Sequence, residues 1–188
     1  NIENEYILKN IKLNNKPVIF VSGHFSNFEL MAQQIELSGV DLATIYRPLN
    51  NKFLNPIMEN IRKKYICKNQ VKKGISGTKE LLKFFKNNVS IALMIDQRVS
   101  EGIKSPFFNF DAYTTTIPAQ FVKRFNAQIV PVHIVRTEKN YFNLKIHQPV
   151  IFDKNENIES ITKNLNKILE EMIISNPDQW IWTHSRWK

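Results

Sequence analysis

The chain has few of the residues that build covalent or metal-bound frameworks. Its 188 residues include one cysteine, Cys67, which excludes an internal disulfide and a multi-cysteine metal site and favours a reducing compartment. Only five glycines are present, which argues against a glycine-rich nucleotide cradle. The longest clearly apolar run, residues 91–95, is far shorter than the roughly 20 residues that cross a bilayer. We therefore expect a soluble or peripheral protein.

The composition is that of a single folded domain. Hydrophobic residues make up 43% of the chain, and 13 Phe with 3 Trp supply enough bulk for a sizeable core. The length suits one domain, which we expect to occupy residues 1–188. Residue 1 is Asn rather than Met and no signal-peptide pattern follows, so we expect the chain to begin inside a longer reading frame.

Positive charge is concentrated in one region. Residues 50–86 contain ten basic and two acidic residues, which accounts for most of the formal charge of +9. Such a field attracts phosphorylated ligands, anionic lipid headgroups, nucleic acid or an acidic partner protein, although a solvated lysine-rich helix would look the same. Phe53, Ile57, Ile61 and Tyr65 form a helical stripe that we expect to face the core, and nucleic acid is therefore disfavoured.

Strands and helices are expected to alternate along most of the chain. Short apolar runs predict strands at residues 17–22, 42–46, 90–95, 129–136 and 141–147, and helical spacing predicts helices at 27–38, 51–65, 77–86, 118–125 and from 158 onward. Residues 96–116 show no periodicity, and we expect a long functional loop there. The pattern predicts an α/β fold with a mostly parallel central sheet flanked by helices and an antiparallel addition near the C-terminus.

Polar clusters follow three of the predicted strands. They comprise residues 23–29, residues 46–47 and residues 96–98. Ligands of open parallel sheets bind beyond the carboxyl ends of the strands, so these clusters are the candidates for a site.

His24 and Glu29 are the strongest pair of candidate catalytic residues. His24 follows a buried strand and Glu29 lies in the first turn of the next helix, so the carboxylate can fold back towards the imidazole. A histidine can take a proton from a hydroxyl while a carboxylate fixes its tautomer. No serine or cysteine lies at a nucleophile elbow, which favours direct attack by a substrate hydroxyl. A capping or satisfied buried histidine remains the structural alternative.

The other two clusters supply candidates for binding. Arg47 can stabilise a developing oxyanion or clamp a phosphate, or it can be a surface arginine before a turn. Asp96 can orient Arg47 or a substrate group, or it can cap a loop. The amides of Asn27 and Gln97 are candidates for substrate or oxyanion binding. The histidine and carboxylates match no zinc spacing, so we expect no metal.

Ordered blocks of the sequence are similar to those of one enzyme family. The blocks are Ser22-Gly-His-Phe-Ser-Asn-Phe-Glu29, Tyr46-Arg47-Pro48-Leu49 with Asn55-Pro56-Ile57, Asp96-Gln97-Arg98 with Ser105-Pro106-Phe107-Phe108, and the ending Pro177-Asp-Gln-Trp-Ile-Trp-Thr-His-Ser-Arg-Trp-Lys188. They resemble the bacterial lipid A biosynthesis acyltransferases, the late lauroyl- and myristoyltransferases of lipopolysaccharide assembly. Ser26, Phe28 and Ser185 depart from the family's usual Gly, Trp and Arg, changes that we expect to affect acceptor or chain-length preference.

The resemblance implies a glycerolipid-acyltransferase-like fold and a specific reaction. A fatty acyl chain would move from acyl carrier protein to a hydroxyl of a lipid A precursor, with no cofactor. By position, His24 and Glu29 match the family's His-x-x-x-x-Glu dyad, Arg47 the arginine of the second block and Asp96 the acid of the third. The family's N-terminal membrane helix has no counterpart here, so we expect a peripheral protein at the cytoplasmic face of the inner membrane.

This interpretation gives roles to other features and leaves alternatives open. The basic region can meet the acidic carrier protein, the acceptor's phosphates or an anionic membrane surface. The C-terminal aromatic residues, with Arg186 and Lys188, can anchor the chain in a membrane interface or simply dock on the core. One rival is an acyltransferase that uses coenzyme A thioesters with lysophospholipid or glycerol phosphate. The other is a basic nucleic-acid-binding protein.

Overall fold

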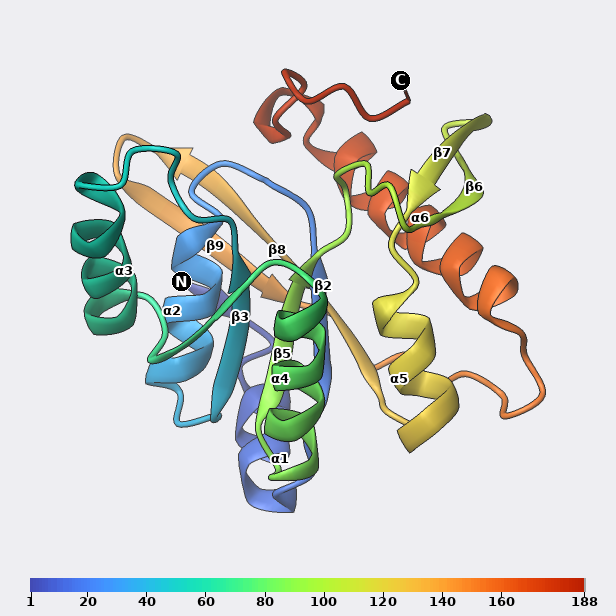
Figure 1. The fold of residues 1–188 in the computed structure, drawn as a ribbon, viewed down its shortest axis with the longest axis horizontal. Helices are drawn as coiled ribbons and strands as arrows, with labels where there is room; N and C mark the ends of the chain where they lie inside the picture. Colours follow the sequence, from blue (N-terminus) through green and yellow to red (C-terminus); the bar gives the residue numbers. More distant parts are fainter. Residues whose placement is uncertain (188) are drawn as a thin grey trace.

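The protein is built around a mostly parallel sheet, as predicted. A computed structural model describes residues 1–187, and seven strands in this part of the chain form one sheet in the order β1-β9-β8-β2-β5-β3-β4 (Figure 1). The strands are β1 (Ile2–Glu3), β2 (Ile19–Ser22), β3 (Leu42–Tyr46), β4 (Asn69–Lys72), β5 (Ser90–Met94), β8 (Ile129–Glu138) and β9 (Tyr141–Ile146). Strands β8, β2, β5, β3 and β4 run parallel, and β9 is the predicted antiparallel addition to β8.

Helices pack against both faces of this sheet. They are α1 (Tyr6–Asn14), α2 (Glu29–Leu37), α3 (Leu54–Tyr65), α4 (Ile75–Lys86), α5 (Ile117–Phe125) and α6 (Ile158–Ser175), with a short 3₁₀ turn at Pro177–Gln179. None of the helices within residues 1–187 has both the length and the apolar character that a membrane span requires.

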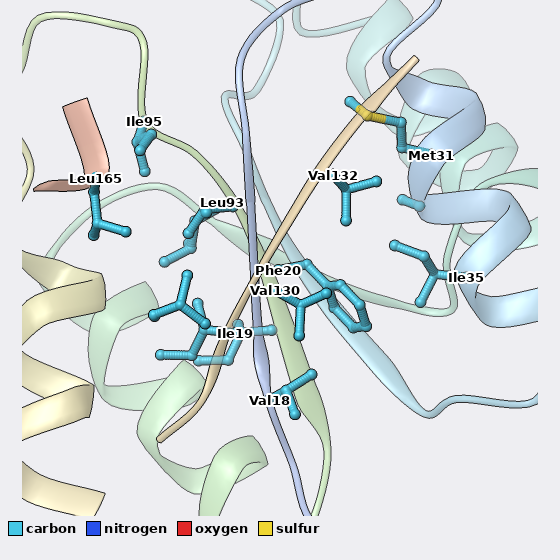
Figure 2. Close-up of a cluster of buried hydrophobic side chains, with 14 of the residues drawn as sticks. Val18, Ile19, Phe20, Met31, Ile35, Leu93, Ile95, Val130, Val132 and Leu165 are labelled. Atoms are coloured by element: carbon cyan, nitrogen blue, oxygen red, sulfur yellow. The ribbon is translucent and has the colours of Figure 1, made fainter. Parts of the chain in front are cut away.

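The core lies on both sides of the central strands because side chains alternate along each strand. Phe20 of β2 points towards Met31 and Ile35 of α2, whereas its neighbour Ile19 points to the opposite side, where Leu165 of α6 lies (Figure 2). All five of these side chains are at least 98% buried. The observed architecture confirms the predicted α/β class.

The segment expected to be one long loop contains a β-hairpin. Strand β6 (Ile103–Phe107) pairs antiparallel with β7 (Phe110–Thr114). The two connecting residues, Phe108 and Asn109, have φ angles of 50° and 64°, which is the left-handed geometry of a tight hairpin turn. That turn normally carries Asn-Gly or Asp-Gly, so the sequence lacked the usual signal. Helix α1 and strands β1 and β4 were also not predicted.

Helix α3 overturns another expectation. Its apolar stripe was predicted to face the core, but the helix contains no buried residue, and Phe53, just before it, is 88% exposed. The prediction was wrong because periodicity reveals that a helix has an apolar side, not what that side meets.

The C-terminal segment docks on the core through a buried arginine. Arg186 is fully buried and donates hydrogen bonds to the Tyr113 carbonyl and the Thr114 hydroxyl, each at 2.7 Å. Its guanidinium lies 4.9 Å from the ring centroid of Phe107. Burial lowers the pKa of Arg186 to about 10, so the group stays charged at neutral pH. Arg186 and Lys188 were predicted either to anchor the chain in a membrane interface or to dock on the core. Arg186 docks on the core, and Lys188 lies outside the described residues.

The three C-terminal tryptophans differ in burial. Trp180 is only 4% exposed and belongs to the core, whereas Trp182 and Trp187 are 54% and 39% exposed. Docking on the core is thus the observed arrangement for Trp180, and the interface role stays a prediction for the other two.

A pair of histidines connects β8 to the end of β9. His133 Nδ1 lies 2.9 Å from His147 Nε2, so one ring donates a hydrogen bond to the other. Burial, with smaller contributions from the neighbouring His147 and Lys145 and against the opposing charge of Glu3, lowers the pKa of His133 to about 4. The pKa of His147 is lowered as well, also mainly by burial. Both rings are therefore neutral in the folded protein at pH 7.

Acidification is expected to destabilise the fold through His133. Its pKa is about 4 when folded and 6.5 when unfolded, so between these values the unfolded chain binds more protons. The free energy of unfolding should therefore fall as pH drops from about 6.5 to about 4, by about 2 to 3 kcal/mol. Urea unfolding at several pH values gives the free energy of unfolding at each pH. This free energy should depend less steeply on pH in His133→Gln than in the wild type. Identical slopes would contradict this assignment.

Candidate active site

Two adjacent parallel strands bring His24 and Asp96 together. Strand β2 leads to His24 and β5 leads to Asp96, and Ser22 of β2 is in register with Met94 of β5. His24 and Asp96 thus each lie two positions after this Ser22–Met94 pair, at the carboxyl edge of the sheet. His24 Nδ1 is 2.8 Å from Asp96 Oδ1. The sequence predicted this edge as the site, and the structure places both side chains there in direct contact.

Asp96 is a buried carboxylate with several donors. Its side chain is 3% exposed, and its Oδ2 accepts hydrogen bonds from the His24 backbone N–H at 2.7 Å and from Trp180 Nε1 at 2.9 Å. Burial by itself would raise the pKa of Asp96, but interactions with His24 and Trp180 outweigh it and hold this pKa below its ordinary value. Asp96 is therefore ionised at neutral pH.

Gly23 permits the close approach of the two strands' ends. A Cβ at this position would lie 3.0 Å from a Leu169 methyl carbon and 3.3 Å from the Asp96 carboxyl carbon. Both separations are too short for ordinary packing, so a larger residue would push the loop away from Asp96 and weaken its backbone hydrogen bond.

The C-terminal segment holds the loop that carries His24. The His24 carbonyl accepts a hydrogen bond from the Ile181 backbone N–H at 3.0 Å, and the Ser26 N–H donates to the Gln179 carbonyl at 2.7 Å. Trp180, between them, donates its indole N–H to Asp96. The segment therefore positions both partners of the pair. Trp180 was not among the predicted site residues, because the sequence shows a tryptophan near the end of the chain and not what its N–H meets.

The imidazole of His24 leaves one nitrogen available. Because Nδ1 contacts a carboxylate, we assign the ring proton to Nδ1, which leaves a lone pair on Nε2. No side chain or backbone group among the described residues binds Nε2, and the side chain is 18% exposed. The ring also packs edge-on against Phe28, with centroids 4.6 Å apart. His24 is therefore oriented on one side and accessible on the other.

Glu29 has a different partner from the predicted one. It begins α2, and its Oε1 accepts a hydrogen bond from Arg62 Nε of α3 at 3.0 Å. In this structure it does not fold back onto His24, because a guanidinium from the neighbouring helix holds it. Asp96, which we expected to orient Arg47 or a substrate group, contacts the imidazole instead. Arg62 was not singled out from the sequence, since its helix alone does not show which element it faces.

The remaining candidates lie near the same edge without joining this contact. Arg47 and Asn27 are exposed, Gln97 is partly buried, and their side chains make no hydrogen bond within residues 1–187. They follow β3, β2 and β5 respectively, as predicted. Their roles toward a substrate stay predictions.

Among residues 1–187, the site contains a base but no evident protein nucleophile. Cys67 is fully buried, and burial raises the pKa of its thiol to about 12, so it is neither accessible nor ionised. Ser22 is buried, and its hydroxyl hydrogen-bonds to the Gly23 carbonyl. Within the described part of the chain, no three His, Cys, Asp or Glu side chains are close enough to hold a metal ion. The arrangement suits proton removal from a hydroxyl that enters from outside.

Comparison with known proteins identifies a family of acyltransferases. The whole chain, residues 1–188, matches the family described as bacterial lipid A biosynthesis acyltransferase. It is 25% identical over 185 residues to a lipid A biosynthesis palmitoleoyltransferase of Escherichia coli strain K12, covering 96% of this chain and 59% of that protein. It is 22% identical over 180 residues to lipid A biosynthesis acyltransferase 2 of Shigella flexneri, covering 94% and 57%. The chain thus spans less than two thirds of these curated relatives.

A solved structure shares the fold. The crystal structure of the 1-acyl-sn-glycerophosphate acyltransferase PlsC from Thermotoga maritima superposes with a TM-score of 0.51, covering 94% of this chain and 82% of that one. The sequences are 16% identical, so the likeness concerns the fold alone.

Proposed function

Because this chain belongs to the bacterial lipid A biosynthesis acyltransferases, we propose that it transfers a fatty acyl chain from acyl carrier protein to a hydroxyl of a lipid A precursor. The observation that carries the chemical part of the proposal is the contact between His24 and Asp96, with the other imidazole nitrogen free at the mouth of the sheet. The identity of donor and acceptor rests on the family.

The reaction would proceed by direct attack. His24 Nε2 takes the proton of the acceptor's hydroxyl while the oxygen bonds to the thioester carbonyl carbon. Asp96 holds the ring in the required tautomer and stabilises the imidazolium that forms. The carbon–sulfur bond then breaks, and the leaving sulfur takes the proton back from His24. Arg47, exposed at the same edge, is available to the oxyanion or to a phosphate of the acceptor.

Two carboxylates receive different roles in this proposal. Asp96 orients His24, because it is the carboxylate in contact with the imidazole. Glu29 acts through Arg62 and fixes the start of α2 against α3, which keeps the loop between residues 24 and 29 in place. The mechanism therefore retains the predicted general base, and it transfers the orienting role from Glu29 to Asp96.

The location proposed for the protein follows from its substrates. We place it as a peripheral protein at the cytoplasmic face of the inner membrane, where acyl carrier protein and a lipid acceptor can both be reached. The basic residues between positions 50 and 86 suit an acidic carrier protein, a phosphorylated acceptor and an anionic membrane surface.

A comparison of donors and acceptors tests the proposed function. Purified protein would be given acyl carrier protein thioesters or coenzyme A thioesters, each with a lipid A precursor or a lysophospholipid. We expect a product only from the carrier-protein donor with the lipid A precursor, detected by mass spectrometry as one added acyl chain. Efficient transfer from coenzyme A to lysophospholipid would instead establish the alternative acyltransferase. A nucleic acid bound tightly at moderate salt, with no transfer from either donor, would reject both.

A further inference from the structure

Helix α3 turns its polar side towards the protein and its apolar side outward, the reverse of an ordinary surface helix. Its polar side faces the protein: Arg62 bonds Glu29 of α2, and Glu59 lies 3.3 Å from Lys72 at the end of β4. The Asn55 amide also donates to Glu59 at 2.7 Å. Interactions with neighbouring side chains, including the Tyr46 hydroxyl, lower the pKa of Glu59 to about 2. Polar contacts, not an apolar seam, therefore hold this helix against the rest of the molecule.

The apolar side of α3 is left outside. The exposed apolar side chains, with their exposed fractions, are those of Phe53 just before the helix (88%), Leu54 (51%), Ile57 (56%), Ile61 (40%) and Tyr65 (54%). In Figure 1 the helix lies at the outer rim of the molecule. A surface helix of a soluble domain normally turns such residues inward. The ridge extends for about 18 Å along the helix, given a rise of about 1.5 Å per residue.

Exposed lysines without a carboxylate partner among the described residues lie on α3 and just before it. Lys52, Lys63 and Lys64 are exposed, and none forms an ion pair with a carboxylate of residues 1–187. Lys64 lies against the ridge itself, with Nζ 5.1 Å from the Tyr65 ring centroid. The acidic residue of the helix, Glu59, is directed inward. The outward surface of α3 thus combines apolar side chains with lysines and no carboxylate.

We propose that α3 lies in the headgroup region of an anionic lipid bilayer, with its apolar ridge inserted between the lipids and its lysines on their phosphates. A helix with an apolar face and a basic border binds such an interface by both kinds of contact. An acidic carrier protein would satisfy the lysines but leave most of the apolar side chains in water.

This placement brings the candidate active site to the membrane. Helix α3 begins at the edge of the sheet where the loop with His24 lies, and Arg62 of α3 binds Glu29, five residues after His24. A bilayer on α3 would therefore lie beside the site's mouth, where a lipid acceptor arrives. The proposed membrane contact of α3 deepens the proposed function by naming the surface that meets the membrane. Only the claim that the site faces a lipid acceptor rests on that function. Vesicle binding requires no acyl transfer, so the two proposals can fail separately.

Sedimentation with vesicles tests the proposal. Purified protein would be mixed with vesicles of phosphatidylcholine alone or with added phosphatidylglycerol, and the bound fraction measured at low and high salt. We expect binding to the anionic vesicles that weakens as salt rises. Ile57→Gln with Ile61→Gln should reduce the partition coefficient about tenfold or more, because the variant removes inserted apolar surface. Lys63→Gln with Lys64→Gln should weaken binding mainly at low salt.

A matched control removes two exposed leucines elsewhere. Leu13 of α1 and Leu37 of α2 are 81% and 72% exposed, and Leu13→Gln with Leu37→Gln should bind vesicles like the wild type. Thermal unfolding should be nearly unchanged in all three variants, since every replaced side chain is exposed. The proposal is overturned if the wild type does not bind anionic vesicles, or if the isoleucine variant binds them equally well. It is also overturned if that variant instead abolishes self-association or binding to acyl carrier protein.

Discussion

Replacement of His24 by alanine is expected to lower the rate of acyl transfer by about 10²- to 10⁴-fold, the usual effect of losing a positioned general base. No other group among the described residues is placed to replace it. Both oxygens of the Asp96 carboxylate are engaged by His24 and Trp180, and the side chain is only 3% exposed. It therefore does not itself reach an incoming hydroxyl. The loss should therefore appear in the rate of the chemical step. The measurement is product formation under saturating donor and acceptor.

Two controls make this result specific. His24→Ala leaves Asp96 its hydrogen bonds from the residue 24 backbone N–H and from Trp180, so circular dichroism and thermal unfolding should stay close to the wild type. His184 is an exposed histidine of the C-terminal segment, and His184→Ala should transfer acyl chains at the wild-type rate. Retention of substantial activity by folded His24→Ala protein would remove the general base from the mechanism.

The second large effect is expected at Asp96. Asp96→Asn keeps the size of the side chain but removes its charge, so the imidazolium loses its counterion and Nδ1 no longer holds its proton by preference. We expect the rate to fall by about 10²-fold or more, an effect like that of removing the base itself. A downfield proton resonance from His24 Nδ1–H should be present in the wild-type spectrum and absent from Asp96→Asn. A purely structural role of Asp96 would change stability without this spectroscopic loss.

Glu29→Gln is the matched test of the other carboxylate. Its side chain binds Arg62 and not His24, so we expect the variant to lose no more than about tenfold in rate and to keep the Nδ1–H resonance. The opposite outcome, a severe loss in Glu29→Gln with near-normal activity in Asp96→Asn, would return the orienting role to Glu29. The two variants together therefore decide which carboxylate acts on the imidazole.

Much of the scaffold could be predicted from local patterns. Buried parallel strands appear as short continuous apolar runs, and β2, β3 and β5 were located within two residues of their observed bounds for this reason. The β6–β7 hairpin was missed because its turn, Phe108-Asn109, has Phe at its first position and no glycine, although Asn109 is a common turn residue. Helix α1 and strands β1 and β4 were missed as well.

The sequence by itself determined the α/β class, the edge of the sheet where polar residues gather, and the candidacy of both His24 and Asp96, because each of these follows from periodicity and from the ends of single strands. Only the tertiary structure decided which groups meet. His24 contacts a carboxylate 72 positions away instead of one 5 positions away, since β2 and β5 are neighbours in space. The outward face of α3 was decided in the same way, by Arg62 and its partner on α2. A pairing between distant segments leaves no mark in the spacing of either segment.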